Sequence, residues 1–342
     1  MLSYEERQKE WEQDKSYLFF ALNLIFIVWC FNSYYSLIFL IPLVLYIHLF
    51  KIKGEVILWA TLIGTALAYL QPLKCPNTYF NYLFDFHKPL NNFLRKYYSE
   101  RDASFIALLL FNSGKKESDT YESFKELGIA HLICISGLHF VLIKKVLYYL
   151  LFKKEKASKI VTPIVLIIWW CFTNFSIPCL RVILTTFLNT KSKLKNWSLA
   201  TILVPLFNFG IYTNYSFLLS FIITLLLMLV EGKHKAQKCF ILIFIYSSLI
   251  TLPWTNKLYL LSFINLIIFS PIVTLFFIYF FLTFPLLFLA TLNSKLIDLF
   301  YFLLKHSYLN KASLNISWSY EASTIALLLF TTAIVINLRR NK

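Results

Sequence analysis

The sequence has few charged residues. Only 15% of its 342 residues are Asp, Glu, Lys or Arg, whereas charged residues make up about a quarter of an ordinary soluble domain. Hydrophobic residues make up 58% and the mean hydropathy is +0.66. This balance argues against a soluble enzyme and is typical of an integral membrane protein. We therefore predict an all-α polytopic membrane protein with about 10–12 transmembrane helices.

The apolar segments give the expected positions of these helices. A spanning helix needs about 17–25 mostly apolar residues. Candidate spans lie near 17–31, 34–50, 55–70, 129–152, 160–175, 177–190, 198–212, 215–230, 239–252, 260–281, 283–304 and 322–338. No cleavable signal peptide is expected, because the mixed-charge residues 1–15 pass directly into the first apolar segment.

Lysine placement sets the expected orientation, because short cytoplasmic loops are enriched in Lys and Arg. The basic stretches are 51–53, 153–159, 191–195, 233–238 and 339–342. All of them fall on one side only if 160–190 is split into two spans at 174–178. We therefore expect a multi-pass protein of the cytoplasmic (inner) membrane with both termini cytoplasmic.

The sequence also lacks the patterns of a metal centre or a disulfide framework. Its six cysteines show no CxxC pairing, so they are interpreted as small core residues. A zinc site at His131 and His139 lacks a clustered third ligand. No metal or cofactor is predicted. The net charge of +16 suggests nucleic acid as a partner, but most of the excess lies in cytoplasmic loops, where orientation explains it.

Residues 72–128 form the clearest interruption between spans, and we expect them outside the membrane on the non-cytoplasmic face. Two amphipathic helices are predicted in this segment. Arg95, Lys96, Tyr97 and Tyr98 alternate cations with aromatic rings, a combination that suits single-stranded nucleic acid. The interpretation that we favour from the sequence is a helix at the membrane surface, whose rings and cations lie among lipid headgroups; DNA contact is the alternative.

Glycine is scarce, with seven in the chain, and two of them bracket polar residues in GIAHLICISGLHFVLI, residues 128–143. Gly128 and Gly137 permit a bend or close helix approach. His131, Ser136 and His139 are expected to face the protein interior or a water-filled path. Two other interpretations stay open: hydrogen bonds that tie helices together, and a hydrolase with Ser136 as nucleophile and His139 as base.

Other polar or helix-bending residues lie within later apolar segments. Arg181 follows Pro178 by about one turn, so it either faces a cavity or anion, or reaches the outer interface. Asn265 precedes Pro271 by six residues and is expected to satisfy backbone carbonyls. Ser220 is expected to make a helix contact.

The segment FKELGIAHLICISGLHFVL, residues 124–142, resembles the signature of the ComEC-type competence family, G-x-x-H-x-x-x-I-S-G-L-H. Four further segments match in family order: 108–116, 177–188, 214–229 and 251–273. The resemblance covers residues 104 to 290.

The resemblance implies a channel that conducts single-stranded DNA across the cytoplasmic membrane during natural transformation. It favours His131, Ser136, Gly137, His139 and Arg181 as residues that line or brace the path. The implied organisation is N-terminal spans at 1–71, an extracytoplasmic segment at 72–128 and the channel domain at 129–338. Expected partners are single-stranded DNA, the lipid bilayer, and separate proteins acting as DNA receptor, nuclease and cytoplasmic helicase; a homo-oligomeric pore is left open.

The chain departs from full-length relatives in two respects. Residues 72–103 are too few for their OB-like domain, and no HxHxDH motif of a metallo-β-lactamase-like domain occurs. We therefore expect no nuclease activity and no enzymatic activity. The alternatives are the intramembrane serine hydrolase and a small-molecule transporter, for which no inverted repeats were detected.

Overall fold

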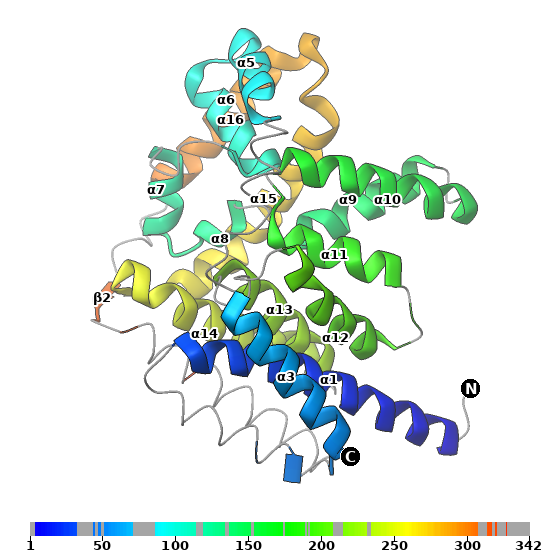
Figure 1. Ribbon diagram of the computed structural model, residues 1–342. Helices are drawn as coiled ribbons and strands as arrows, with labels where there is room; N and C mark the ends of the chain where they lie inside the picture. Colours follow the sequence, from blue (N-terminus) through cyan, green and yellow to red (C-terminus); the bar gives the residue numbers. More distant parts are fainter. Residues whose placement is uncertain are drawn as a thin grey trace. The chain divides into compact units, whose positions relative to one another are not determined.

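The protein is described by a computed structural model (Figure 1). The described residues are 4–32, 51–70, 86–113, 119–133, 137–151, 154–173, 175–188, 192–207, 215–230, 234–306 and 313–316, with a few single residues between them. They are overwhelmingly helical, which confirms the predicted all-α class. The predicted spans at 34–50 and 322–338 lie outside the described residues.

The chain divides into two compact units that are discontinuous in sequence. Unit 1 comprises residues 1–78, 184–256 and 317–342, and unit 2 comprises 79–183 and 257–316. The domains expected from the sequence are continuous segments instead. The expected domains were defined by proposed function along the chain, not by packing. Their boundaries stay a prediction.

Unit 1 is built on two closely packed helices, α1 (Tyr4–Asn32) and α3 (Gly54–Leu70) (Figure 1). The apolar second half of α1 buries Phe19, Leu24 and Val28 completely. A Cβ at Gly64 of α3 would lie 3.0 Å from Ile27 of α1. The missing side chain therefore lets the two helices approach closely.

The remaining helices of unit 1 are α12 (Lys193–Leu203), the short 3-10 helix η1 (Val204–Leu206), α13 (Tyr215–Leu229) and α14 (Lys235–Thr255). The hydroxyl of Ser192 caps α12 and donates to Asp14 of α1. The indole of Trp197 donates to the Phe221 carbonyl of α13 at 2.9 Å. Polar contacts thus reinforce apolar packing in this unit.

Unit 2 contains α5 (His87–Tyr97), α6 (Glu100–Phe111), α7 (Asp119–Glu126), α8 (Ala130–Ile133), α9 (Gly137–Leu150) and α10 (Glu155–Phe172). It also contains the first residues of α11 (Ile177–Leu188), then α15 (Ser262–Thr283), the 3-10 helix η3 (Leu287–Leu289) and α16 (Ala290–His306). Two three-residue strands, β1 (Lys257–Tyr259) and β2 (Ser313–Asn315), pair antiparallel. This strand pair was not predicted.

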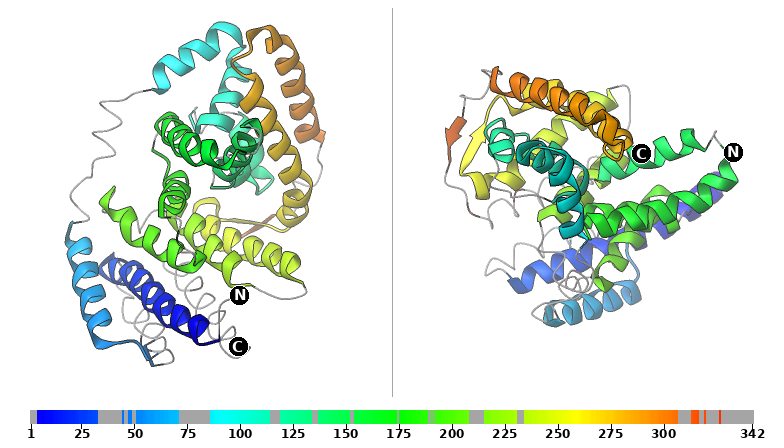
Figure 2. Two further views of the ribbon diagram at one scale, coloured as in Figure 1. Left: turned by 90° about the vertical axis from the view of Figure 1, so that its right-hand side faces the viewer. Right: turned by 90° about the horizontal axis from the view of Figure 1, so that it is seen from above.

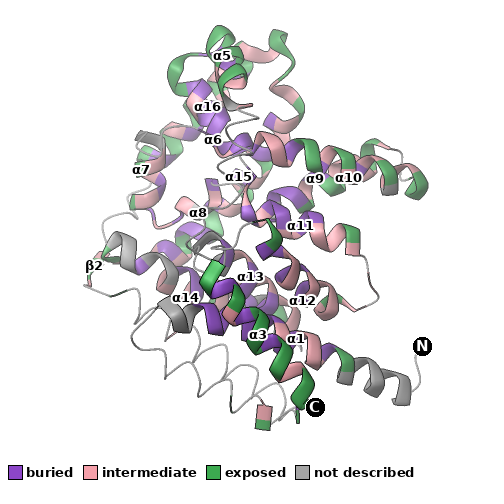
Figure 3. Ribbon diagram, viewed as in Figure 1, coloured by how far each residue is buried: buried purple, intermediate pink, exposed green. Residues whose placement is uncertain are grey.

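Helix α6 is the core of unit 2 rather than an amphipathic helix at its surface. Every residue from Phe105 to Phe111 is buried (Figure 3). The Phe105 ring packs 5.9 Å from Phe280 of α15 and 5.3 Å from Phe300 of α16. Of the helices in 72–128, α5 and α7 have one buried and one exposed side, as expected of amphipathic helices, whereas the 105–111 stretch of α6 is buried on every side.

The expected split of 160–190 is confirmed, since α10 ends at Phe172 and α11 begins at Ile177. The span predicted at 129–152 contains α8, which reaches Ile133, and α9, which starts at Gly137. Residues 134–136 between them lie outside the described residues, so the continuity of this span stays a prediction. Most of the mixed-charge segment 1–15 belongs to α1, which begins at Tyr4.

Two helical segments of the described residues are long and apolar enough to cross a membrane by length and composition: Ser262–Thr283 and Leu287–His306. In Figure 2 the helices α15 and α16 lie beside the α5–α6 segment. Shorter apolar helices include Gly54–Leu70 and Ile177–Leu188.

Candidate functional site

The signature segment begins at a tight helix end. Gly128 follows α7 with φ of +70°, a left-handed conformation that side chains disfavour. Its N–H donates to Lys125 O at 2.9 Å, and the Ile129 N–H donates to Phe124 O at 2.9 Å. These two bonds form a Schellman motif, which glycine commonly completes. Phe124 and Ile129 are both fully buried, which supplies the apolar contact of that motif.

The same turn packs against the start of α15. A Cβ at Gly128 would lie 2.6 Å from the Cβ of Ser262 and 2.9 Å from the Cβ of Tyr259. The amide of Asn265 donates to the Leu127 carbonyl at 3.0 Å. Gly128 is therefore needed for two reasons, its backbone conformation and the close approach of α15.

Gly137, the second glycine of the signature, opens α9 and lies against α11. A Cβ at this position would overlap the guanidinium Nη2 of Arg181, and would lie 3.2 Å from its Cζ and 3.4 Å from Val182 Cγ2. Gly137 is buried and Arg181 is partly exposed. The structure thus brings together two residues, far apart in the sequence, that the family resemblance assigns to the path.

His139, one residue beyond Leu138 on α9, packs in the core. Its side chain is buried, and its ring centroid lies 4.3 Å from that of Phe277 of α15 in an edge-on contact. This position ties α9 to α15. Ser136 lies outside the described residues, as does the side chain of His131, so the predicted grouping of these residues with His139 stays a prediction.

The residues predicted to support the helices have distinct surroundings. Pro178 occupies the first turn of α11, where a missing N–H is tolerated. Pro271 lies inside α15, but the Asn265 amide bonds the carbonyl of Leu127 in a neighbouring segment. Ser220 lies on α13, in the other compact unit.

The basic and aromatic residues of α5 divide into two groups. Arg95, Lys96 and Tyr97 are exposed. Tyr98 is buried at 6% exposure, and its hydroxyl accepts a hydrogen bond from Asn293 at 2.9 Å. The expectation that Tyr98 contacts DNA is therefore corrected, because its ring belongs to the packing between the α5–α6 connection and α16.

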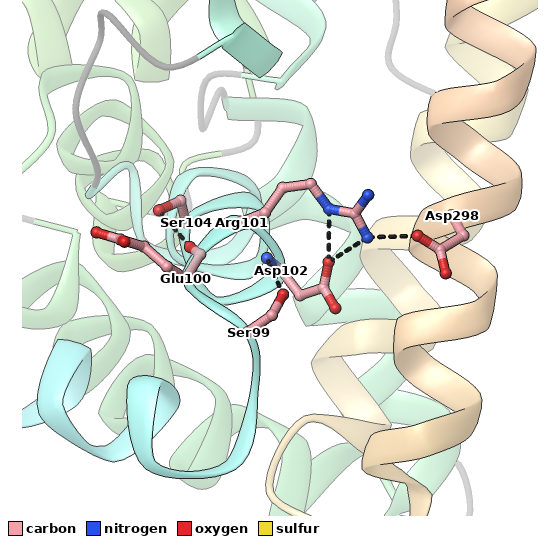
Figure 4. A network of polar contacts seen from close by, with 6 residues as sticks. All are labelled: Ser99, Glu100, Arg101, Asp102, Ser104 and Asp298. Atoms are coloured by element: carbon pink, nitrogen blue, oxygen red, sulfur yellow. Dashed lines mark hydrogen bonds and ion pairs between the residues drawn. The ribbon is translucent and has the colours of Figure 1, made fainter.

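A charged network that the sequence interpretation missed anchors the start of α6 (Figure 4). Arg101 donates to Asp102 at 2.9 Å and also to Asp298 of α16. Its guanidinium carbon lies 5.0 Å from the ring centroid of Tyr301. The signal was available: Asp298 lies in a long apolar segment, where an ionisable residue demands a partner.

The described residues hold no group of three or more His, Cys, Asp or Glu placed to bind a metal ion. Cys171, Cys179 and Cys239 have free thiols. The site therefore consists of the Gly128 turn seated on α15 and the Gly137–Arg181 contact between α9 and α11. A permanent cation beside a closely packed backbone is suited to attracting an anion.

Comparison with known proteins decides the family. A model of the Competence protein family matches residues 108–338, more than half of the chain. This chain belongs to the Competence protein family. The match includes both signature glycines, Arg181 and α15, and the family is associated with competence and with membranes.

Two relatives of this Competence-family chain come from mycoplasmas. It is 28% identical over 192 residues to the uncharacterized protein MG316 homolog of Mycoplasma pneumoniae, covering 54% of this chain and 52% of the relative. It is 29% identical over 182 residues to the uncharacterized protein MG316 of Mycoplasma genitalium, covering 51% and 49%. The matched part thus spans about half the length of each relative. No solved structure matches the chain.

Proposed function

We propose that this protein is the membrane channel through which single-stranded DNA crosses the cytoplasmic membrane during natural transformation. Membership of the Competence protein family supports a role in DNA uptake. In this proposal the chain is a multi-pass protein with both termini cytoplasmic, and residues 72–128 lie on the non-cytoplasmic side. The lysine asymmetry of the loops supports that orientation.

The contact between Gly137 and Arg181 is the observation that carries the proposal. Arginine stays charged under all physiological conditions, and at this place it lies at the second glycine of the family signature. A cation beside the path attracts phosphates without reading base sequence. The absence of a side chain at position 137 leaves space for the guanidinium.

In this proposal the protein transports and does not catalyse. A separate nuclease supplies single strands, a separate receptor delivers DNA, and a cytoplasmic helicase draws in the strand; assembly of several chains into one pore is compatible with this scheme. The serine hydrolase is less well supported, because the predicted base His139 is buried against Phe277.

Entry of labelled single-stranded DNA into proteoliposomes tests the proposal. We expect nuclease-protected label with the wild-type chain and a several-fold reduction with Arg181→Ala, with Arg181→Lys intermediate because it keeps the charge but not the planar fork. Membrane levels of each variant are matched. Equal protection by wild type and Arg181→Ala, or by empty liposomes, would refute the assignment.

A further inference from the structure

Helix α5 presents one buried face and one exposed face (Figure 3). Leu94 and Tyr98 are buried against the rest of unit 2, and Leu90 is half-buried. The exposed face, called the α5 face below, consists of Lys88, Pro89, Asn92, Phe93, Arg95, Lys96 and Tyr97. It is therefore a basic and aromatic surface on a helix whose apolar residues are already packed.

The aromatic residues of the α5 face form an ordered pair. Phe93 and Tyr97, one helical turn apart, have ring centroids 5.3 Å apart, and they remain 36% and 39% exposed. The Lys96 ammonium lies 5.4 Å from the Tyr97 ring centroid. Exposed rings of this size next to a cation offer stacking and charge attraction at the same place.

The ion pair that Arg95 makes on this face can be replaced by a contact with a ligand. Arg95 contacts Glu100 at 3.6 Å, but both side chains are more than half exposed. Such exposed ion pairs contribute little free energy, and salt screens them. A phosphate group can therefore replace Glu100 at the Arg95 guanidinium without breaking a buried interaction.

We propose that the α5 face is a binding site for single-stranded DNA, separate from the Gly137–Arg181 contact. Bases stack on Phe93 and Tyr97, while Arg95 and Lys96 bind the phosphates. The site is tolerant of sequence, since every base has a face that stacks. Its biological role, capture of the strand before it crosses the membrane, rests on the proposed function.

The packing of α5 argues against the membrane surface as the occupant of this face. A helix that lies on a bilayer buries its apolar stripe among the lipids. In α5 that stripe is Leu90, Leu94 and the adjoining Tyr98, and it faces the protein. What is left outward is mostly polar, which fits a polyanion with exposed bases better than acyl chains.

The face is also held in a fixed place. The Ser99 hydroxyl caps α6 by accepting from the Asp102 N–H at 3.2 Å, directly after α5 ends. Tyr98 is bonded by Asn293 of α16, and Arg101 joins Asp298 (Figure 4). A rigid surface loses less entropy when it binds a flexible strand.

Fluorescence anisotropy of the purified full chain in nanodiscs, with a labelled 20-nucleotide oligo-dT, tests the site. Phe93→Ala with Tyr97→Ala should weaken binding by about 5- to 150-fold for each ring, the loss expected for base stacking. Arg95→Gln with Lys96→Gln should reduce the slope of log K against log salt by about 1.4, or about 0.7 for each cation. Lys235→Gln with Lys238→Gln, two exposed lysines of α14, is the matched control and should leave affinity nearly unchanged.

A second polyanion separates stacking from charge. Heparin has no bases, so the aromatic double variant should bind it as the wild type does, while the Arg95 and Lys96 variant should bind it more weakly. Equal weakening for oligo-dT and heparin in the aromatic variant would overturn base stacking. Oligo-dT binding unchanged in both α5 variants would overturn the site.

A spin label at Asn92→Cys, in a background without the native cysteines, tests the lipid alternative. Collisions with a water-soluble relaxation agent are expected, and exclusive collisions with oxygen would assign α5 to the membrane surface and overturn the site. The uptake assay is read separately. If the α5 variants take up DNA normally and bind oligo-dT as the wild type does, the α5 binding site is refuted and the channel proposal stands. If oligo-dT binding depends on the α5 residues but no variant and no wild-type protein takes up DNA, the channel proposal is refuted and the binding site stands.

Discussion

Gly137 lies directly against the guanidinium of Arg181, although one opens α9 and the other belongs to the first half of α11. The atom that a Cβ would overlap is the far end of a flexible side chain. Substitution at position 137 should therefore displace the cation more than it destabilises the fold.

This relationship predicts non-additive effects on uptake. Gly137→Ala should reduce protected DNA uptake to about the level of Arg181→Ala, and the double variant should be no worse than either, because residues in contact do not act independently. Gly137→Leu should abolish uptake while the protein still inserts. Uptake normalised to membrane level measures all four variants; losses that multiply in the double variant would contradict the coupling.

For Gly128 we expect the opposite: substitution should destabilise the fold. Gly128→Ala combines a left-handed backbone, costing about 1–2 kcal/mol for other residues, with overlap against Cβ atoms of Ser262 and Tyr259 that cannot swing away. We expect a total loss of about 2–4 kcal/mol in the free energy of unfolding. Denaturation in detergent followed by circular dichroism measures it.

Gly54→Ala is the matched control for this experiment. Gly54 begins α3, and a Cβ there would meet nothing within 4 Å. Its substitution should change the unfolding free energy by less than about 1 kcal/mol. Similar losses at positions 54 and 128 would show that the turn does not depend on its packing against α15.

Asn265→Ala should cost less than Gly128→Ala, even though both residues hold the same turn. The substitution removes the bond to the Leu127 carbonyl, but it also removes a buried Oδ1 that accepts no hydrogen bond from the described residues. Interhelical side-chain bonds in membrane proteins average about 0.6 kcal/mol. A net loss below about 1 kcal/mol is expected by the same denaturation assay. A loss above that of Gly128→Ala would contradict this ranking.

The two carboxylates that bind Arg101 should contribute differently to the free energy of unfolding. Asp298 and Arg101 are both about half exposed, whereas the side chain of Asp102 is 4% exposed. Asp298→Ala should therefore cost about 0–1 kcal/mol and lose its effect in high salt. Asp102→Ala should cost more and be less sensitive to salt, because buried pairs are screened less. Equal losses with equal salt dependence would contradict this distinction.

The sequence predicted a helix boundary where apolar length and lysine placement agree. The division between α10 and α11 came from keeping lysine loops on one side, and the structure places the helix ends at Phe172 and Ile177. Composition also predicted the all-α class. Both predictions rest on residues close together in the sequence, so the order of apolar and basic residues is sufficient to make them.

Features that depend on tertiary partners escaped the sequence. The run from Phe105 to Phe111 shows apolarity but not the neighbouring helices that bury it on all sides. Tyr98 looks like its neighbour Tyr97 until Asn293, far along the chain, is placed beside it. The signature glycines were singled out by scarcity, but their reasons, a Schellman turn and a guanidinium contact, exist only in the fold.

Tyr259 links the stability of the signature turn to alkaline pH. Burial raises the pKa of its phenol, and the charges of Glu126 and Glu122 on α7 raise it further. Between the unfolded value of about 10 and the higher folded value, the unfolded chain releases a proton that the folded chain keeps. Stability from this group is therefore fully present below about pH 10 and is lost as pH rises through the folded pKa.

Tyr259→Phe should flatten the fall of the unfolding free energy above about pH 10, because phenylalanine has no proton to release. Glu126→Gln should give part of the same change, since it removes one of the charges that raise the pKa of Tyr259. Tyr97→Phe, which removes an exposed hydroxyl, is the control. Urea unfolding at a series of pH values from 8 to about 11 provides the measurement. If the unfolding free energy falls as steeply above about pH 10 in Tyr259→Phe as in the wild type, this phenol has the same pKa in the folded and unfolded states. The stability of the Gly128 turn would then not depend on pH through Tyr259.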